Sequence, residues 1–186
     1  MTARSQVTLE YPDVAVGAVL AGSARRFRDR IVVHYQGREL SYADLYARAC
    51  AFAQALRATG IGRGDAVAIN LPNCPQYAIA YYGTLLAGAT FTPANPLLPP
   101  EDLAAQLADS GARAAVTWAP VAPALLGVRD RTSVELVLVT DRDQGVDPAH
   151  RPPLPDGTLD FEDFHAAAAT DPFDPGVVPA ADLAHL

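Results

Sequence analysis

Glycines and basic side chains are the residues of this sequence that could take part in phosphate chemistry. Gly60-Ile61-Gly62-Arg63-Gly64 has the glycine density of a nucleotide-binding loop. A phosphate-binding loop follows a strand and opens a helix, so that its amide groups point at the anion, whereas this segment precedes a predicted strand. All 14 basic residues are arginine, so no lysine is available as a phosphate ligand, Schiff-base former or general base. We therefore interpret the glycine segment as a helix-to-strand turn.

The other reactive side chains also lack a catalytic arrangement. The four histidines show no metal-ligand spacing: His34, His150, His165 and His185. Cys50 and Cys74 fall on separate predicted helices and are expected to be free thiols in a reducing compartment. Ser41 is explained by helix capping, since no nucleophile motif surrounds it. From the residues alone we predict no catalytic residue and no metal site.

Composition excludes several classes of protein. Half of the 186 residues are hydrophobic and 19% are charged, which is typical of a globular chain. A net charge of −7 argues against nucleic acid as a partner, because phosphate binding needs a basic surface. No secretory signal or transmembrane segment is recognisable, and we expect a cytoplasmic protein.

The elements that would position a site centre on residues 66–96. Ala66 to Leu71 is a continuous apolar run, as expected for a parallel strand that is buried on both faces. Asn73, with Gln76 three residues later, is predicted to cap a helix that ends before Gly88. A second strand over 89–92 follows, so the segment predicts a β-α-β unit.

Elements of the same kind flank this unit. Before it we expect a helix capped by Asp13, a hairpin that turns at Gln36-Gly37, and a long helix with a capping box at Ser41 and Asp44. After it we expect a helix from Pro99 and strands over 114–118 and 136–139, with a short helix between them. This alternation predicts the α/β class, with an open, mainly parallel sheet and helices on both faces.

The predicted domain organisation has four parts. Residues 1–12 form a flexible arm, 13–140 the α/β core and 141–158 a surface loop rich in proline and aspartate. Residues 159–186 contain a short helix capped by Asp160, a connector and the start of a strand. We expect this strand to be truncated at residue 186, which would leave an exposed sheet edge prone to self-association.

Several ordered motifs resemble those of acyl-adenylate-forming (AMP-dependent) enzymes, in particular fatty-acyl-CoA and aryl-CoA ligases. Each motif is common by itself, but the order of the set matches that family across residues 38–118. The motifs are Gly37-Arg38-Glu39-Leu40-Ser41-Tyr42-Ala43-Asp44-Leu45, the stretch Leu56 to Ala68 with its glycine turn, Leu71-Pro72-Asn73-Cys74-Pro75-Gln76-Tyr77, Leu86-Ala87-Gly88-Ala89-Thr90-Phe91-Thr92-Pro93-Ala94-Asn95-Pro96, and Leu107-Ala108-Asp109-Ser110-Gly111-Ala112-Arg113. The resemblance identifies this chain as similar to the N-terminal subdomain of such a synthetase.

The resemblance implies an activity for a longer parent enzyme. That enzyme would activate a fatty or aryl carboxylic acid with ATP and Mg, then transfer the acyl group to CoA; a fatty acid is the favoured substrate. Asp182 to Leu186 looks like the strand that leads into the family's phosphate loop, so that loop and its lysine would lie beyond this chain. The chain alone is therefore expected to be non-catalytic, to bind none of these cofactors tightly and to have the remainder of the synthetase as its partner.

One candidate site is carried over from the resemblance. Asn95 and Pro96 follow one predicted strand and Trp118 ends another, and ligands of open α/β sheets bind outside the carboxyl ends of strands. In the family this edge lies near bound CoA, so we predict a CoA-side role for Asn95, Pro96 and Trp118. The competing interpretation is that these residues only shape turns. For the whole chain, the alternative to a synthetase fragment is a naturally short, non-enzymatic binding or assembly module.

Overall fold

A parallel sheet forms the centre of the protein, as the sequence predicts. The computed structural model describes residues 13–140 and 153–186, so the predicted arm over 1–12 and residues 141–152 of the predicted loop lie outside it. The sheet order is β4-β3-β5-β6-β7, and every pair is parallel. The strands are β3 (Ala66–Asn70), β4 (Thr90–Pro93), β5 (Ala112–Trp118), β6 (Leu136–Thr140) and β7 (Leu159–Asp160). The two-residue strand β7 was not predicted.

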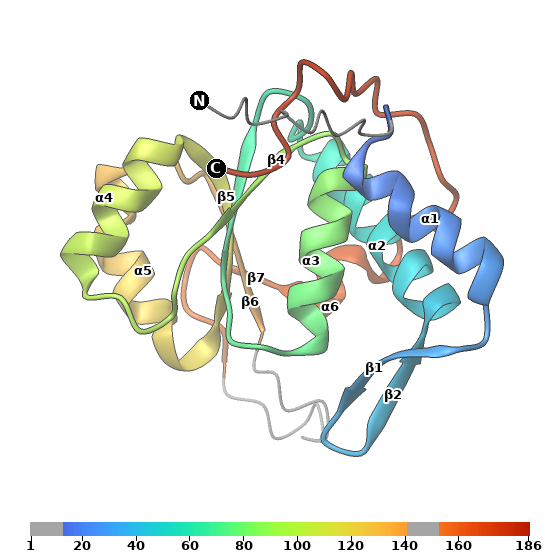
Figure 1. Cartoon of the computed structure of the whole chain (residues 1–186). Coiled ribbons are helices and arrows are strands. Elements are labelled where there is room, and N and C mark those ends of the chain that lie inside the picture. Colours follow the sequence, from blue (N-terminus) through green and yellow to red (C-terminus); the bar gives the residue numbers. More distant parts are fainter. Residues whose placement is uncertain (1–12, 141–152) are drawn as a thin grey trace, which may run out of the picture.

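Helices cover both faces of the sheet (Figure 1). One layer holds α1 (Val16–Phe27), α2 (Tyr42–Ala58), α3 (Pro75–Leu86) and α6 (Phe161–Ala166), and the other holds α4 (Pro100–Ser110) and α5 (Ala122–Val128). Two 3-10 turns flank α5, at Ala119–Val121 and Arg129–Arg131. Alternate residues of β3 serve the two layers: Val67 and Ile69 belong to the first core, Ala66 and Ala68 to the second. This two-sided burial explains why β3 has no polar alternation.

Local signals at the hairpin and at α2 are confirmed. The antiparallel strands β1 (Ile31–Tyr35) and β2 (Arg38–Ser41) turn through Gln36 and Gly37, whose φ angles are 48° and 77°. At the start of α2, the Asp44 amide donates to Ser41 Oγ at 3.1 Å, and the Ser41 amide donates to Asp44 Oδ2 at 3.3 Å. The predicted capping box is therefore present. Asp160 likewise caps α6, by accepting from the amides of Glu162 and Asp163.

Two predicted helix caps are wrong. α1 begins after Ala15 and α3 begins after Cys74, and neither start has a capping side chain, so Asp13 and Asn73 do not cap. In α3 the reason is Pro75, which occupies the first helical position with its φ already fixed, so the helix starts later than the Asn73 signal suggests.

The chain returns to the sheet at its C-terminal end. The Phe91 amide of β4 donates to the Ala184 carbonyl at 2.9 Å, and the Leu186 amide donates to the Phe91 carbonyl at 3.0 Å. Residues 184–186 thus run parallel to β4 along its outer edge, in agreement with the extended structure predicted for the last residues. Within the described residues, no helix is both long and apolar enough to cross a bilayer.

A pair of helical glycines tests the close packing of α2 against α3. A Cβ at Gly83 of α3 would lie 2.6 Å from Phe52 Cδ1 and 2.9 Å from the Ala49 carbonyl oxygen of α2, whereas a Cβ at Gly22 of α1 meets nothing within 4 Å. We expect Gly83→Ala to lower the free energy of unfolding by about 1–3 kcal/mol through overpacking. Gly22→Ala should raise it by about 0.5–1 kcal/mol, because alanine is the better helix former. Urea denaturation of both variants measures this, and a stable Gly83→Ala protein would contradict the packing.

Candidate functional site at the carboxyl ends of the strands

The structure places the three predicted CoA-side residues on one edge of the sheet. Asn95 and Pro96 follow β4, and Trp118 is the last residue of β5. Since β3 lies between β4 and β5, the two turns are separated by two strand spacings, about 10 Å. In a sheet of this strand order the connections reverse direction beside β3, and the crevice at such a reversal is the usual ligand position.

Asn95 also serves the turn that it begins. Its Oδ1 accepts a hydrogen bond from the Leu97 amide at 2.9 Å, and its carbonyl accepts from the Leu98 amide at 3.1 Å. Gln106 Nε2 of α4 donates to the Pro93 carbonyl at 2.5 Å and fastens the start of the same turn. Because Asn95 is exposed, the turn holds its side chain at the surface of the edge. Turn shaping and ligand contact are thus both compatible with its position.

A buried polar network beneath this edge was missed by sequence reasoning. Thr117 Oγ1 donates to Asn70 Oδ1 at 2.9 Å, and Asn70 Nδ2 donates to the Ala94 carbonyl at 3.2 Å. Asn70 is 1% exposed and Thr117 is fully buried. The network joins the carboxyl ends of β3 and β5 to the turn after β4, so it fixes the spacing of the two candidate turns. The sequence signal that could have revealed this network is Asn70, the one polar residue in the otherwise apolar strand β3.

A second buried group lies where α3 meets α6. Gln76 Nε2 donates to Glu162 Oε1 at 3.0 Å, while Gln76 Oε1 has no hydrogen-bond partner among the described residues. His165 Nδ1 lies 2.7 Å from the Phe161 carbonyl, so this nitrogen carries the proton of that hydrogen bond. Its Nε2 lies 3.9 Å from Glu162 Oε2. Burial holds the pKa of His165 below its ordinary value, against the opposing effect of the Glu162 carboxylate.

The glycine turn at the opposite edge is structural, as predicted. Gly60 and Gly64 have φ angles of 79° and 91°, and the Gly62 amide donates to Asp65 Oδ2 at 2.9 Å. Arg113 Nη1 lies 3.0 Å from Asp65 Oδ1 and also donates to the Gly60 carbonyl at 3.2 Å. With its amides and carbonyls committed in this way, the turn does not have the form of an ATP phosphate site.

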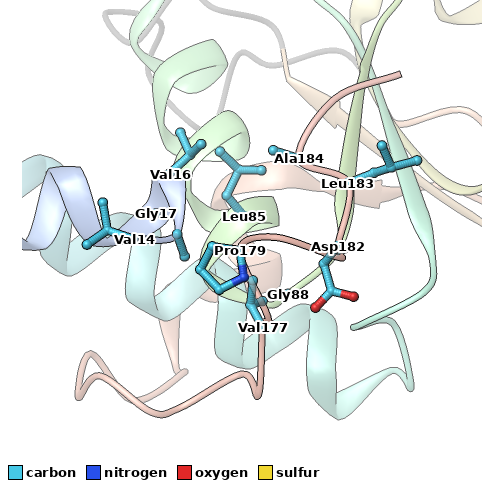
Figure 2. Close-up of a pocket in the computed structure, with 12 residues that line it drawn as sticks. Val14, Val16, Gly17, Leu85, Gly88, Val177, Pro179, Asp182, Leu183 and Ala184 are labelled. Carbon is cyan, nitrogen blue, oxygen red and sulfur yellow. The ribbon is translucent and has the colours of Figure 1, made fainter. Parts of the chain in front are cut away.

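Two cavities lie between α1, α3 and the segment 172–184. The first, of about 60 Å³, has Asp182 as its one charged side chain (Figure 2), and that carboxylate already accepts from the Val178 amide at 2.7 Å and pairs with Arg63 at 2.9 Å. The second, of about 270 Å³, is mainly apolar and includes Tyr46 and Cys50. Burial raises the pKa of the Cys50 thiol, which keeps it protonated and poorly nucleophilic. Neither cavity contains groups arranged for catalysis.

Metal-ligating side chains do not converge in residues 13–140 or 153–186: no three of His, Cys, Asp and Glu are grouped so as to hold an ion. What the described residues provide at the carboxyl edge is a rigid, uncharged surface that ends in Asn95, Pro96 and Trp118.

His165 predicts a pH dependence of stability. Because its pKa is depressed in the folded state, the unfolded chain binds more protons as the pH falls below about 6.5, and the folded state loses stability there. We expect His165→Gln to flatten the fall in unfolding free energy just below that pH. Urea denaturation at several pH values measures the slope, with the exposed His34→Gln as the matched control. An unchanged slope in His165→Gln would show that the histidine is not responsible.

Comparison with known proteins agrees with the fold and the motifs. The AMP-binding enzyme family matches residues 20–179. A long-chain-fatty-acid–CoA ligase of Bacillus subtilis is 33% identical over 132 residues, which are 71% of this chain and 24% of that protein. Its counterpart from Escherichia coli O6:H1 is 38% identical over 119 residues, 63% of this chain and 21% of the relative. The chain thus spans under a quarter of the length of these curated relatives.

Solved structures show the same fold. The anthranilate CoA ligase AuaEII, in complex with anthranoyl-AMP, superposes with a TM-score of 0.82 at 18% identity, covering 94% of this chain and 32% of that one. A long-chain-fatty-acid-CoA ligase from Archaeoglobus fulgidus gives 0.80 at 19% identity, covering 96% and 35%. The fold is that of part of an adenylate-forming enzyme. By the family match over most of its length, this chain belongs to the AMP-binding enzyme family.

Proposed function

We propose that this chain is the N-terminal part of an ATP-dependent acyl-CoA ligase whose preferred substrate is a fatty acid. The observation that carries the proposal is the match to long-chain-fatty-acid–CoA ligases over 119 to 132 residues, which are only 21% to 24% of those relatives. In this proposal ATP, Mg and CoA are used by the whole enzyme. Because ATP and CoA are substrates found in the cytoplasm, we propose that the chain works in the cytoplasm.

The chain by itself is proposed to be non-catalytic. Its described residues contain no cluster of three or more His, Cys, Asp or Glu side chains that could hold a metal ion, and the full sequence contains no lysine to bind phosphate. Its contribution would be structural: a sheet whose carboxyl edge is held by the buried Asn70–Thr117 network. Its main partner would be the remainder of the ligase, and a second copy of the chain would pair with the sheet edge at residues 184–186.

A hybrid enzyme tests this proposal. The matched segment of the Bacillus subtilis relative is replaced by this chain, and ATP–pyrophosphate exchange is measured with long-chain fatty acids and with benzoate. We expect no exchange from the 186-residue chain alone, and exchange from the hybrid that fatty acids stimulate more than benzoate does.

The matched control is a second hybrid that carries the corresponding segment of the Escherichia coli relative. Exchange by the chain alone would refute the non-catalytic assignment. An inactive hybrid beside an active control would favour the alternative, a short binding or assembly module without enzymatic activity.

We further propose that Asn95, Pro96 and Trp118 contact CoA in the assembled enzyme. Asn95 and Trp118 lie at the ends of the two strands that flank β3, and an indole beside such a crevice offers an apolar face for stacking on a base. Asn95→Ala removes both a CoA contact and the turn acceptor for Leu97. Asn95→Asp retains that acceptor and adds a charge that repels the phosphates of CoA.

We expect both Asn95 variants to raise the KM for CoA several-fold in the hybrid enzyme. Their ATP–pyrophosphate exchange should stay unchanged, because that half-reaction does not use CoA. A rise in KM for Asn95→Ala alone would indicate that the residue only shapes its turn. Unchanged KM values in both variants would remove Asn95 from the CoA site.

A further inference from the structure

The segment after α6 is fixed at both ends and encloses space in between. Residues 172–184, which we call the strap, run beside α1 and α3 toward the outer edge of β4 (Figure 1). Just before the strap, Gln54 Nε2 of α2 donates to the Asp171 carbonyl at 3.2 Å. Near its end, Thr90 Oγ1 of β4 donates to the Leu183 carbonyl at 3.1 Å. Between these attachments the strap forms one wall of the two cavities described above.

The two cavities are neighbours and make one elongated space. Gly17 of α1, Leu85 of α3 and Val177 of the strap line both of them, and Figure 2 shows these three residues around the smaller one. The larger cavity also reaches Tyr46 and Cys50 of α2. We call the combined space, which extends from α2 along the strap, the strap cavity.

The size and walls of the strap cavity suit a small apolar molecule. Its larger part has a volume of about 270 Å³. An apolar protein cavity of about 150 Å³ stays free of water and binds benzene, so by proportion this one has room for about ten carbon atoms. Small or apolar side chains make up much of the wall, among them Ala18, Ala21, Leu86, Pro172 and Pro175. The two prolines have fixed φ angles, so this part of the wall needs little ordering when a ligand enters.

The charges of the wall disfavour an anionic ligand. Among the described residues that line the strap cavity, the charged side chains are those of Asp174 and Asp182. Asp174 Oδ1 accepts from the Gly176 amide at 2.8 Å, and Asp182 Oδ2 accepts from the Val178 amide at 2.7 Å. Both carboxylates are thus held in place as negative charges. A carboxylate ligand would lose its hydration and meet two like charges.

The neutral polar groups of the wall lie on α2. The side chains of Tyr46 and Cys50 hydrogen-bond to each other, and burial raises the pKa of both. They therefore stay protonated and uncharged at neutral pH. A phenol hydroxyl both donates and accepts, so Tyr46 can pair with a ligand hydroxyl at this part of the cavity.

We propose that the strap cavity binds an uncharged, unbranched alkyl compound of about eight to ten carbons, for which a primary alkanol is the simplest example. Its hydroxyl would lie at Tyr46, and its chain would run past Gly17 and Leu85 beneath the strap. The proposal rests on α1, α2, α3 and the strap, and it does not depend on the ligase activity.

Protection of Cys50 from a thiol reagent tests the proposal. Cys74→Ala leaves Cys50 as the one thiol of the chain, and its labelling by methyl methanethiosulfonate is followed by mass spectrometry. At ten times its Kd, 1-octanol should slow the labelling about ten-fold. From 1-butanol to 1-octanol the concentration for half protection should fall about four-fold per added carbon, because each methylene leaves water. Octanoate should need a concentration at least about ten-fold higher than octanol.

Two variants in the Cys74→Ala background locate the site. Ala21→Leu places a larger side chain in the cavity and should raise the octanol concentration for half protection about ten-fold or more. Tyr46→Phe removes the hydroxyl and should raise it about five-fold, with the chain-length dependence retained. The matched control is Ala105→Leu, the same substitution at an exposed position of α4 in the other helical layer. It should leave protection unchanged.

The alternatives give different results. Equal protection by octanol and octanoate would overturn the assignment of an uncharged ligand. Octanol that speeds the labelling, or protection without a chain-length dependence, would overturn the cavity as a binding site. So would equal effects of Ala21→Leu and Ala105→Leu. Circular dichroism checks that each variant is folded, and if Ala21→Leu is not, Tyr46→Phe and the alkanol series decide.

Discussion

Two-sided burial of β3 is the constraint on which the rest of this structure depends. Its five residues are all buried, so the strand must be covered by a helical layer on each face and by neighbouring strands on each edge. The apolar residues need only packing partners, but Asn70 at the end of the strand must also satisfy its amide. Thr117 and the Ala94 carbonyl do so, and the hydrogen bonds that satisfy Asn70 therefore also align the carboxyl ends of three neighbouring segments.

Charged and uncharged polar groups are separated along the strands. At the amino edge, Arg113 joins Asp65 and Glu135 at 3.0 Å and 2.7 Å, and these pairs raise the already high pKa of its guanidinium further. Asp65 and Arg113 belong to two of the motifs that resemble adenylate-forming enzymes, and here they form one contact. These two motifs therefore contain residues that hold neighbouring segments of the sheet together. The residues with a possible ligand role lie at the other edge.

Much of the fold was predictable because its signals are local. The capping box at Ser41 involves residues three apart, the Gln36-Gly37 turn involves adjacent residues, and Gly88 and Gly111 end their helices with positive φ angles. The Asn73 cap was wrong because a local signal competed with a stronger one, the proline two residues later. Gln76, interpreted as part of that cap, instead reaches Glu162, which is 86 residues away.

The candidate site likewise has features that depend on local sequence and features that depend on contacts between distant residues. Position after a strand is a local property, so Asn95, Pro96 and Trp118 could be assigned to one edge from the sequence. That Asn70 and Thr117 bond to each other depends on β3 and β5 being adjacent, although β4 lies between them in the sequence. A buried amide that spans such neighbours resists displacement, because moving either strand would leave a polar group unsatisfied. The edge is thus rigid before any ligand arrives, which suits a surface whose proposed task is to hold CoA in position for a reaction performed by other residues.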